Sequence, residues 1–368
     1  MSRNGVARIK VIGVGGGGGN AIDRMKKAKV KDVELIAVNT DAQVLSILEA
    51  DRTVQIGVKL TQGLGAGGDP EVGRKAAEES EAELIEMLDG ADMVFITAGM
   101  GGGTGTGAAP VIARLAREAQ ILTVAVVTKP FSFEGRVRAE RARKGIEELR
   151  QYVDTLIAIP NDRLLKVAPP EMPLIKAFEL ADDILRQGIQ GISDLITVPG
   201  MINLDFADIK ATMRNAGTAL MGIGEGEGQN RMRDAARNAI TSPLLEGSIE
   251  GAQRLILNIT GGPDLSLEEV TEAASLVRDT LSEQAEIFFG AVVKEGCERV
   301  RVTVIATGFQ QHEELSKEEL AKRGQLEEDD DEEEQLIEQV ERSLRRDRSR
   351  ADDWDVPTFL RRRKDEKP

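Results

Sequence analysis

The sequence predicts an α/β protein: a parallel-sheet domain, a long central helix, a smaller α/β domain and a disordered C-terminal tail. Glycine-rich loops lie between short apolar runs and helical periodicities, which is typical of parallel strands followed by crossover helices. A second group of apolar runs follows residue 210, and after Gly308 the periodicity gives way to blocks of charge. Such blocks contain too few large apolar residues to form a core, so this part is predicted to be disordered.

Composition excludes several classes of function. The net charge of −15 argues against non-specific binding of nucleic acid, which needs a basic face. The single cysteine, Cys297, excludes an internal disulfide, and the single histidine, His312, lies where the globular pattern ends. Any chemistry must therefore use carboxylates, backbone amides and a hard cation. The chain has no apolar run long enough for a transmembrane helix and no signal-peptide pattern, so a cytoplasmic location is expected.

Residues 8–12 are predicted to form the first strand, and the glycine run 13–19 connects it to a helix. Three of these glycines fit the G-x-G-x-x-G pattern of a Rossmann dinucleotide site: Gly13, Gly15 and Gly18. A Rossmann site also has an acid after its second strand, and the run 33–41 nearly offers one. Taken alone, this stretch indicates a nicotinamide dehydrogenase as strongly as a GTPase.

A second glycine-rich loop, residues 97–110, lies between an apolar run at 93–96 and a helical periodicity that begins at Val111. Its backbone can approach a phosphate closely, and N–H groups at a helix N-terminus point toward bound negative charge. It is not a P-loop, because the run contains no lysine. A Rossmann site for one dinucleotide has no role for a second such loop, which argues against the dehydrogenase.

The string Gly-Gly-Gly-Thr-Gly-Thr-Gly at 101–107 resembles the signature loop of tubulins. Its flanks at 95–100 and 108–110 are similar to those of the FtsZ family of bacterial cell-division GTPases, and the resemblance is collinear over 8–309. It implies a Rossmann-like GTPase domain that binds GTP or GDP, with Mg²⁺ held mainly through the GTP phosphates and no metal ligand assigned to the chain. A monovalent cation at the subunit interface is implied as well.

The resemblance assigns phosphate contacts to three glycine-rich segments. The first two supply Gly16, Gly17, Gly18, Gly19, Asn20, Gly103, Thr104, Gly105 and Thr106. The third would sense the γ-phosphate through Ala66, Gly67 and Gly68, although a solvated turn explains residues 63–70 equally well. Asn39 and Asp41 would stand near the nucleotide and its cation.

Two side chains after the strand at 121–128 fit a ribose and phosphate site. Glu134 supplies a carboxylate for a ribose hydroxyl, and Arg138 supplies a guanidinium for a phosphate. A surface ion pair is the alternative from sequence alone, and the resemblance favours the binding role. Asn161 lies at the end of the strand 156–161, where a polar group facing the nucleotide is expected.

The long helix predicted from 173 to 196 carries a candidate base site. Phe178 and Asp182 are four residues apart and therefore lie on one face of the helix. Guanine would stack on the ring of Phe178 while Asp182 contacts the edge of the base. The alternative for Phe178 is an ordinary position in the core.

The loop at 200–208 carries two carboxylates and an amide. Spacing alone describes them best as solvated loop residues. They match, position by position, the synergy loop by which FtsZ and tubulin-like proteins complete the active site of a neighbouring subunit. Asp205 and Asp208 would then orient the attacking water and the cation, with Asn203 beside them. Carboxylates suffice for this chemistry, because phosphoryl transfer depends on positioning and charge compensation.

These elements define the predicted domains. The chain divides into a GTP-binding domain at 1–172, a central helix at 173–199, a C-terminal domain at 200–310, a charged disordered linker at 311–350 and a partner-binding peptide at 351–368. Strands of the C-terminal domain are predicted at 219–224, 254–259 and 301–307, and helices at 229–240 and 266–280.

The resemblance also implies partners. A second copy of the chain would bind head to tail in a filament of the division ring, at mid-cell on the inner face of the membrane. The peptide Asp352–Lys364, with the only tryptophan, would bind membrane adaptors and division regulators, unless it serves only as a solubilising tail. No nucleic acid and no transmembrane insertion is expected. A filament protein that binds GTP without hydrolysing it is the remaining alternative.

Overall fold

The computed structural model describes residues 7–166, 171–198 and 202–309, apart from 203, 283, 295 and 298. Asn203, the linker 311–350 and the peptide 351–368 lie outside the described residues, and the predictions for them stay predictions. The described residues belong to one compact unit. Among them, no helix is both long and apolar enough to cross a bilayer.

Six strands form the predicted parallel sheet, in the order β3-β2-β1-β4-β5-β6. Their bounds are β1 (Ile9–Val14), β2 (Val33–Asn39), β3 (Arg52–Gln55), β4 (Met93–Gly99), β5 (Leu122–Lys129) and β6 (Thr155–Pro160). The chain builds outward from β1 in one direction and from β4 in the other. Ligands of open α/β sheets bind at such a switch point, outside the carboxyl ends of the strands.

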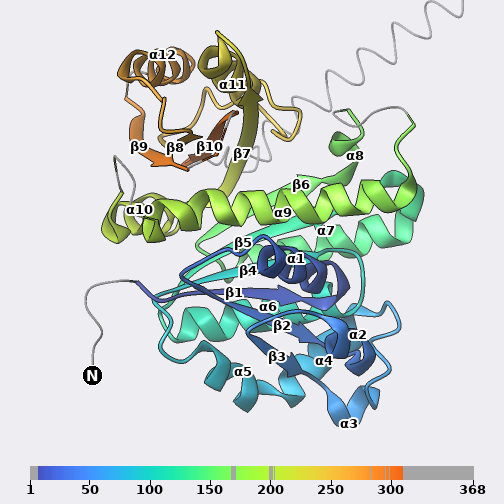
Figure 1. The fold of residues 1–368 in the computed structure, drawn as a ribbon. Coiled ribbons are helices and arrows are strands. Elements are labelled where there is room, and N and C mark those ends of the chain that lie inside the picture. The colour runs from blue at the N-terminus through green and yellow to red at the C-terminus, as the bar shows by residue number, and fades with distance from the viewer. Residues whose placement is uncertain are drawn as a thin grey trace, which may run out of the picture. The chain divides into compact units, whose positions relative to one another are not determined.

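Helices cover both faces of this sheet (Figure 1). They are α1 (Gly15–Lys27), α2 (Ala42–Ile47), α3 (Val58–Thr61), α4 (Pro70–Glu79), α5 (Glu81–Leu88), α6 (Thr104–Glu118), the 3-10 turn η1 (Ser132–Glu134), α7 (Arg136–Arg150) and α8 (Asn161–Leu164). Successive strand residues point to opposite faces. Val11 therefore packs in the core with α1, while its neighbour Ile12 packs in the core with α4 to α6.

The long helix predicted at 173–196 is α9 (Leu174–Thr197), which lies between the parallel sheet and the second sheet (Figure 1). Its buried residues recur at intervals of three and four, for example Ala177, Ala181, Ile184 and Leu185. The same apolar core contains Ile256 and Ile305 of the second sheet. One helix therefore contributes to the packing of both sheets.

The second sheet follows α10 (Phe206–Met213) and confirms the three strands predicted there. Its elements are β7 (Gly217–Gly226), α11 (Arg231–Ile240), β8 (Arg254–Gly261), α12 (Leu267–Arg278), β9 (Glu286–Val293) and β10 (Val300–Thr307). Residues 217–219 of β7 pair with β6, and residues 220–226 pair with β10, so one strand joins the two sheets into a ten-stranded whole. The sequence analysis did not predict β9.

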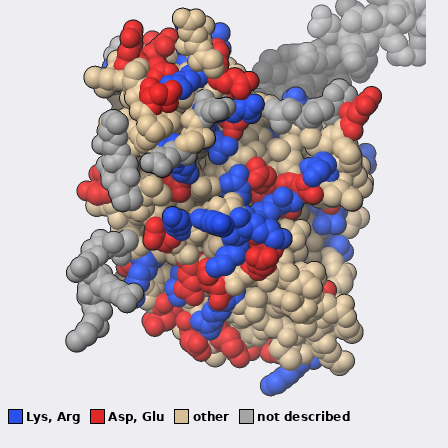
Figure 2. Space-filling model, in the orientation of Figure 1, with Lys and Arg blue, Asp and Glu red and all other residues tan. Residues whose placement is uncertain are grey.

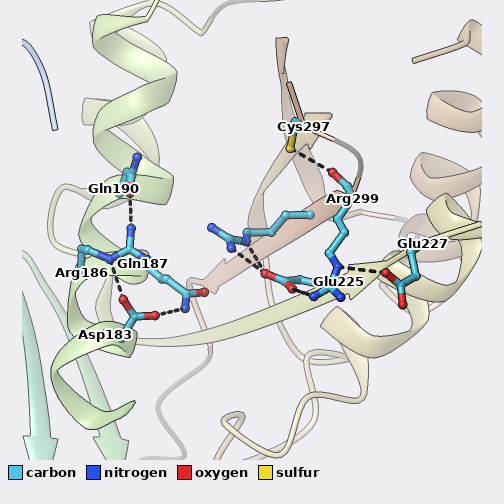
Figure 3. A network of polar contacts seen from close by, with 9 residues as sticks. Asp183, Arg186, Gln187, Gln190, Glu225, Glu227, Cys297 and Arg299 are labelled. Atoms are coloured by element: carbon cyan, nitrogen blue, oxygen red, sulfur yellow. Dashed lines mark hydrogen bonds and ion pairs between the residues drawn. The ribbon is translucent and has the colours of Figure 1, made fainter. Parts of the chain in front are cut away.

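Polar contacts line α9 and the edge of the second sheet (Figure 3). Asp183 accepts hydrogen bonds from Arg186 Nε at 2.7 Å and from Gln187 Nε2 at 2.6 Å. On β7, Glu225 accepts from Arg301 Nε at 2.9 Å. The thiol of Cys297 donates to the carbonyl oxygen of Arg299 at 3.1 Å, so the one cysteine has a hydrogen-bond acceptor in this edge. Acidic and basic side chains are interspersed over the face drawn in Figure 2.

Two helix starts differ from the sequence interpretation. Helix α1 begins at Gly15 and α6 at Thr104, so residues 15–19 of the first predicted glycine loop and 104–110 of the second are helical. Glycine has a low helix propensity, and the pattern of alternating apolar residues starts only after these turns. After residue 70 the chain forms two helices, α4 and α5, which meet at Ser80.

Candidate functional site

The two predicted glycine loops meet at the carboxyl ends of β1 and β4. A Cβ atom at Gly17 would lie 3.2 Å from the backbone nitrogen of Gly99. A Cβ atom at Gly105 would lie 3.1 Å from the carbonyl oxygen of Val14 and 3.0 Å from that of Gly99. The backbones of the two loops therefore touch, with no room for side chains between them. The N-termini of α1 and α6 lie together at this switch point, where their free N–H groups favour an anion.

Glycines in this site divide into two kinds. Gly13 is required by packing, because its Cβ would lie 2.2 Å from the carbonyl oxygen of Gly18. Gly16 and Gly102 are not, since a Cβ at either position would have no other atom within 4 Å. Glycine at an uncrowded position of a helix costs stability without a packing benefit. Packing within the protein therefore does not explain glycine at position 16.

The threonine hydroxyls of the signature loop have partners within the protein. Thr104 Oγ1 lies 2.7 Å from Thr40 Oγ1, and Thr106 Oγ1 accepts a hydrogen bond from the Gly101 backbone at 2.8 Å. Both threonines are buried. They hold the loop in shape, and these contacts leave two hydroxyl protons for a ligand, one from the Thr40 and Thr104 pair and one on Thr106.

Asn39 and Asp41 also have structural contacts. Asp41 caps α2, because its Oδ1 accepts from the backbone of Gln43 at 2.9 Å and of Val44 at 3.2 Å. Asn39 is buried, and its Oδ1 accepts from the Asp41 backbone at 3.3 Å. The Oδ2 atom of Asp41 takes no part in these bonds and can face a ligand.

The third predicted segment packs against the signature loop. A Cβ at Gly103 would lie 2.8 Å from the Cβ of Ala66, so the two backbones are in close contact there. Gly67 and Gly68 have φ angles of 58° and 77°, which favour glycine in this turn. The structure thus brings residues 66–68 to the same edge as residues 16–20 and 103–106.

Glu134 and Arg138 form the ion pair that the sequence left open. Glu134 Oε2 lies 3.0 Å from Arg138 Nε, and Glu134 Oε1 accepts from the backbone of Phe131 at 2.8 Å. Each carboxylate oxygen retains a lone pair for another donor. An ion pair and a binding role are therefore compatible at this position.

An aromatic cluster lies beside this carboxylate. Phe131 stacks on Phe133 with ring centroids 5.1 Å apart, and Phe178 meets Phe131 edge-on at 5.5 Å. Phe178 is 40% exposed, so its ring is not an ordinary core residue. Asn161 is only 6% exposed, yet its Oδ1 has no hydrogen-bond partner. A buried acceptor without a partner is costly, and a ligand donor would satisfy it.

Asp182 lies on α9 opposite two residues of α1. Arg24 Nε is 3.5 Å from its Oδ2, and the side chain is 13% exposed. Burial raises the pKa of Asp182 to about 6, against opposing contacts from Arg24 and Asn20. A carboxylate that is buried at a cost, four residues from an exposed aromatic ring on the same helix, is typical of a binding site.

The predicted loop acids lie at the other end of the molecule. Asp205 caps α10, because its Oδ1 accepts from the Asp208 backbone at 2.8 Å. Helix α10 ends beside the first residue of β6, where Thr155 Oγ1 donates to the carbonyl oxygen of Met213 at 2.5 Å. The first residue of a parallel strand marks the amino edge of the sheet, opposite the glycine loops. Asn203 lies outside the described residues.

The carboxyl edge of the parallel sheet, where the glycine loops lie, is called the glycine edge below. Sequence reasoning missed three residues that contribute to it: Arg24, Thr40 and Phe131. One signal was available, since Asn20 and Arg24 are four residues apart and share a face of α1. Thr40 and Phe131 give no such signal, because their partners are distant in sequence. Among the described residues, no cluster of three or more His, Cys, Asp or Glu could hold a metal ion.

Two family models match the chain. Residues 8–169 match the GTPase domain of the tubulin/FtsZ family, and residues 217–310 match the C-terminal domain of the FtsZ family. An FtsZ dimer of M. jannaschii has a TM-score of 0.81 and 46% identity, covering 84% of this chain and 90% of that one. A mutant of M. jannaschii FtsZ with tyrosine in place of a tryptophan has a TM-score of 0.80 and 46% identity, covering 83% and 92%.

More distant structures share the fold. CetZ2 from Haloferax volcanii, solved as a protofilament bound to GTPγS, has a TM-score of 0.70 at 23% identity and covers 88% of this chain and 99% of that one. At this identity the likeness concerns the fold alone.

The variant Gly16→Ala tests whether glycine at this position is needed for ligand binding rather than for packing. Because the new methyl group meets no protein atom, the variant should be as stable as the parent or more stable, by up to about 1 kcal/mol. Its affinity for GTP should fall about tenfold, because the methyl group occupies space next to a phosphate. Thermal melts and titration with a fluorescent GTP analogue measure both effects. Gly247→Ala, an uncrowded position in the second domain, is the matched control, and equal affinity losses would contradict the assignment.

Asp182→Asn should stabilise the protein without nucleotide while weakening the binding of GTP. A pKa that is higher in the folded than in the unfolded state contributes stability below the unfolded value, and this is lost as pH rises through about 6. The gain should therefore reach as much as about 3 kcal/mol at pH 7.5 and be smaller at pH 5. Urea unfolding at both pH values measures it. A gain that does not depend on pH would show that burial of the charge is not its cause.

Proposed function

Because the chain belongs to the tubulin/FtsZ family of GTPases, we propose that it binds GTP at the glycine edge and assembles head to tail into filaments in which each subunit completes the active site of its neighbour. The filaments would form the cell-division ring, in the cytoplasm at mid-cell on the inner face of the membrane. The M. jannaschii FtsZ at 46% identity was solved as a dimer, which supports self-association.

One observation carries this proposal: the pair Phe178 and Asp182 and the loop acids are at opposite ends of α9. At a rise of about 1.5 Å per residue, Phe178 and Thr197 lie about 28 Å apart along the helix. The glycine loops lie at the carboxyl edge of the sheet, while α10 ends at its amino edge. Asp205 and Asp208 therefore cannot reach a nucleotide in their own chain. A neighbour stacked end to end would bring the two halves together.

Each segment of the glycine edge has a part in this proposal. The backbone at Gly16 to Asn20 and Gly103 to Thr106 would bind the phosphates, and Ala66 to Gly68 would contact the γ-phosphate. Glu134 and Arg138 would bind the ribose and a phosphate. For the base, Phe178 would stack on guanine, Asp182 would accept its N–H groups, and Asn161 would use its unpartnered oxygen.

Hydrolysis would use the neighbour's carboxylates. Asp205 and Asp208, with Asn203, would accept hydrogen bonds from a water and align it with the γ-phosphorus, opposite the bond to the leaving oxygen of GDP. Mg²⁺, bound mainly by the GTP phosphates, would supply charge compensation. Asn39 and Asp41 would face the nucleotide and its cation, and a monovalent cation would sit at the subunit interface.

Exposed apolar side chains at both ends support head-to-tail contact. At the glycine edge these are Ile47, Leu64, Phe133 and Val137. Ile202, next to the loop acids, is exposed at the other end. Two different surfaces that bind each other generate an open filament unless the rotation closes a ring.

The alternatives are now unequal. A nicotinamide dehydrogenase would share the first glycine loop, but the family match identifies a GTPase domain at 8–169. A filament that binds GTP without turnover is separated from our proposal by a measurement of phosphate release.

Specific GTPase activity should depend on protein concentration, because each site needs two chains. It should be near zero below a threshold and rise with light scattering above it.

Asp205→Asn should abolish turnover without loss of stability, since asparagine retains the cap of α10. Asp205→Ala should in addition lose about 1 kcal/mol of stability.

A mixture of two inactive variants tests more directly whether the active site is shared between chains. Asp208→Asn has an intact nucleotide edge, and a variant with impaired GTP binding, such as Thr104→Val, has intact loop acids. Turnover by the mixture should exceed that of either variant alone. If the mixture is no more active than its parts, or if specific activity is constant far below the assembly threshold, the shared site is wrong.

The C-terminal peptide has a proposed role of its own, as a tether to membrane adaptors and division regulators. Residues 352–364 combine Trp354, Phe359 and Leu360 with a basic end, a composition suited to folding on a partner. Removing residues 351–368 should leave GTP turnover unchanged and abolish recruitment to vesicles coated with an adaptor, measured by co-sedimentation. Equal recruitment of the truncated and full chains would contradict the tether.

A further inference from the structure

The short helix α8 contacts the segment that carries Glu134. Asp162 Oδ1 accepts a hydrogen bond from the Ser132 backbone at 2.9 Å, and its Oδ2 accepts from the Ser132 hydroxyl. Asp162 directly follows Asn161, the buried residue with the unpartnered oxygen. Two neighbouring residues of α8 therefore face the same edge, one open to a ligand and one bonded to the turn at 132–134.

The start of this turn is packed against aromatic side chains, and its middle is exposed. It is a single turn of 3-10 helix, closed by the bonds from Glu134 N to the Phe131 oxygen at 3.0 Å and from Gly135 N to the Ser132 oxygen at 3.2 Å. Ser132 and Phe133 are exposed, and Phe131 is the one buried side chain at its start. The aromatic contacts of Phe131 hold the start of the turn, whereas the exposed Ser132 is held by no such packing. Asp162 supplies a charged, two-point anchor from outside the turn.

The position of the turn determines the position of the Glu134 carboxylate. One oxygen of that carboxylate is held by the Phe131 backbone and the other by Arg138. Both donors belong to the turn or to the helix that follows it, so the carboxylate moves with the turn as one body. The bonds from Asp162 to Ser132 attach this body to β6 and α8.

We propose that Asp162 is a positioning residue that fixes the 131–134 turn and so makes the site selective for a guanine ribonucleotide over its deoxy forms. The inference rests on the proposed GTP site, in which Glu134 accepts a hydrogen bond from a ribose hydroxyl. Asp162 itself touches no substrate. Without it the carboxylate is present but no longer held at hydrogen-bond distance from the sugar.

The test compares nucleotides that differ only in the sugar. Affinities for GTP, 2′-deoxy-GTP and 3′-deoxy-GTP are measured by competition with a fluorescent GTP analogue, below the assembly threshold. The parent protein should bind GTP better than at least one deoxy form. Asp162→Ala should lose about tenfold of this preference, because a hydrogen bond to a charged group is lost from the turn. Its affinity for the deoxy form should change little.

Three further variants separate positioning from general stability. Asp162→Asn retains an acceptor for the Ser132 backbone and should restore most of the preference, and Ser132→Ala should lose part of it. Asp154→Ala is the matched control: Asp154 accepts from the backbones of Thr123 at 2.9 Å and Asn215 at 3.3 Å, at the opposite edge of the sheet. It should lower the melting temperature and leave the sugar preference unchanged.

Each outcome decides the inference. A sugar preference that survives in Asp162→Ala overturns it, as does an equal loss in Asp154→Ala. A parent protein that binds GTP and both deoxy forms equally well also overturns it and leaves the GTP site intact. A parent protein that binds no GTP overturns the proposed function as well. A preference lost in Asp162→Ala and restored in Asp162→Asn supports positioning.

Discussion

Contact between two backbones at the carboxyl ends of β1 and β4 is the constraint on which the rest of the site depends. Gly17 lies against Gly99, and Gly105 lies against Val14, with no space for a Cβ atom between them. This approach brings the N-termini of α1 and α6 to one point, where two sets of free N–H groups face the same volume. In the proposed site the backbone would balance the charge of the phosphates, which fits two loops that contain no lysine.

Around this rigid centre the protein retains polar groups that lower its stability. Asp182 is buried against the preference of its charged form, and Asn161 keeps an unpartnered oxygen in the interior. Both cost free energy in the protein without ligand. Asp182 is held by α9, and Asn161 by α8 directly after β6, and the packing of these elements can tolerate the cost. Buried polar groups that lower stability in this way are expected at functional sites.

The sequence predicted the parts of the site that depend on residue type and spacing. The loops at 13–20 and 97–110, the pair Phe178 and Asp182, and the strands around them follow from glycine content and periodicity. Packing requires glycine at position 13 but not at position 16. The sequence could not show this difference, because it depends on the atoms that surround each residue in the fold. The bond of Thr104 to Thr40 and the anchor of Asp162 on Ser132 were invisible for the same reason. Strand β9 was missed, and β7, which pairs with β6 and β10, was predicted as part of a separate unit.

The sequence indicates a domain boundary near residue 200, but packing and hydrogen bonds connect the two sheets closely in the structure. Leu244 belongs to the core beneath α9, and its neighbour Leu245 belongs to the core beneath α11 and α12. Residues 243–246 also contact the domain that carries the glycine loops. Arg163 donates to the Pro243 oxygen at 3.2 Å, and Lys129 Nζ lies 2.6 Å from Glu246 Oε1. Together with the shared strand β7, these contacts make the second sheet an extension of the first. A displacement of the second sheet must therefore act on α8 and on the end of β5, the two segments that flank the Glu134 turn.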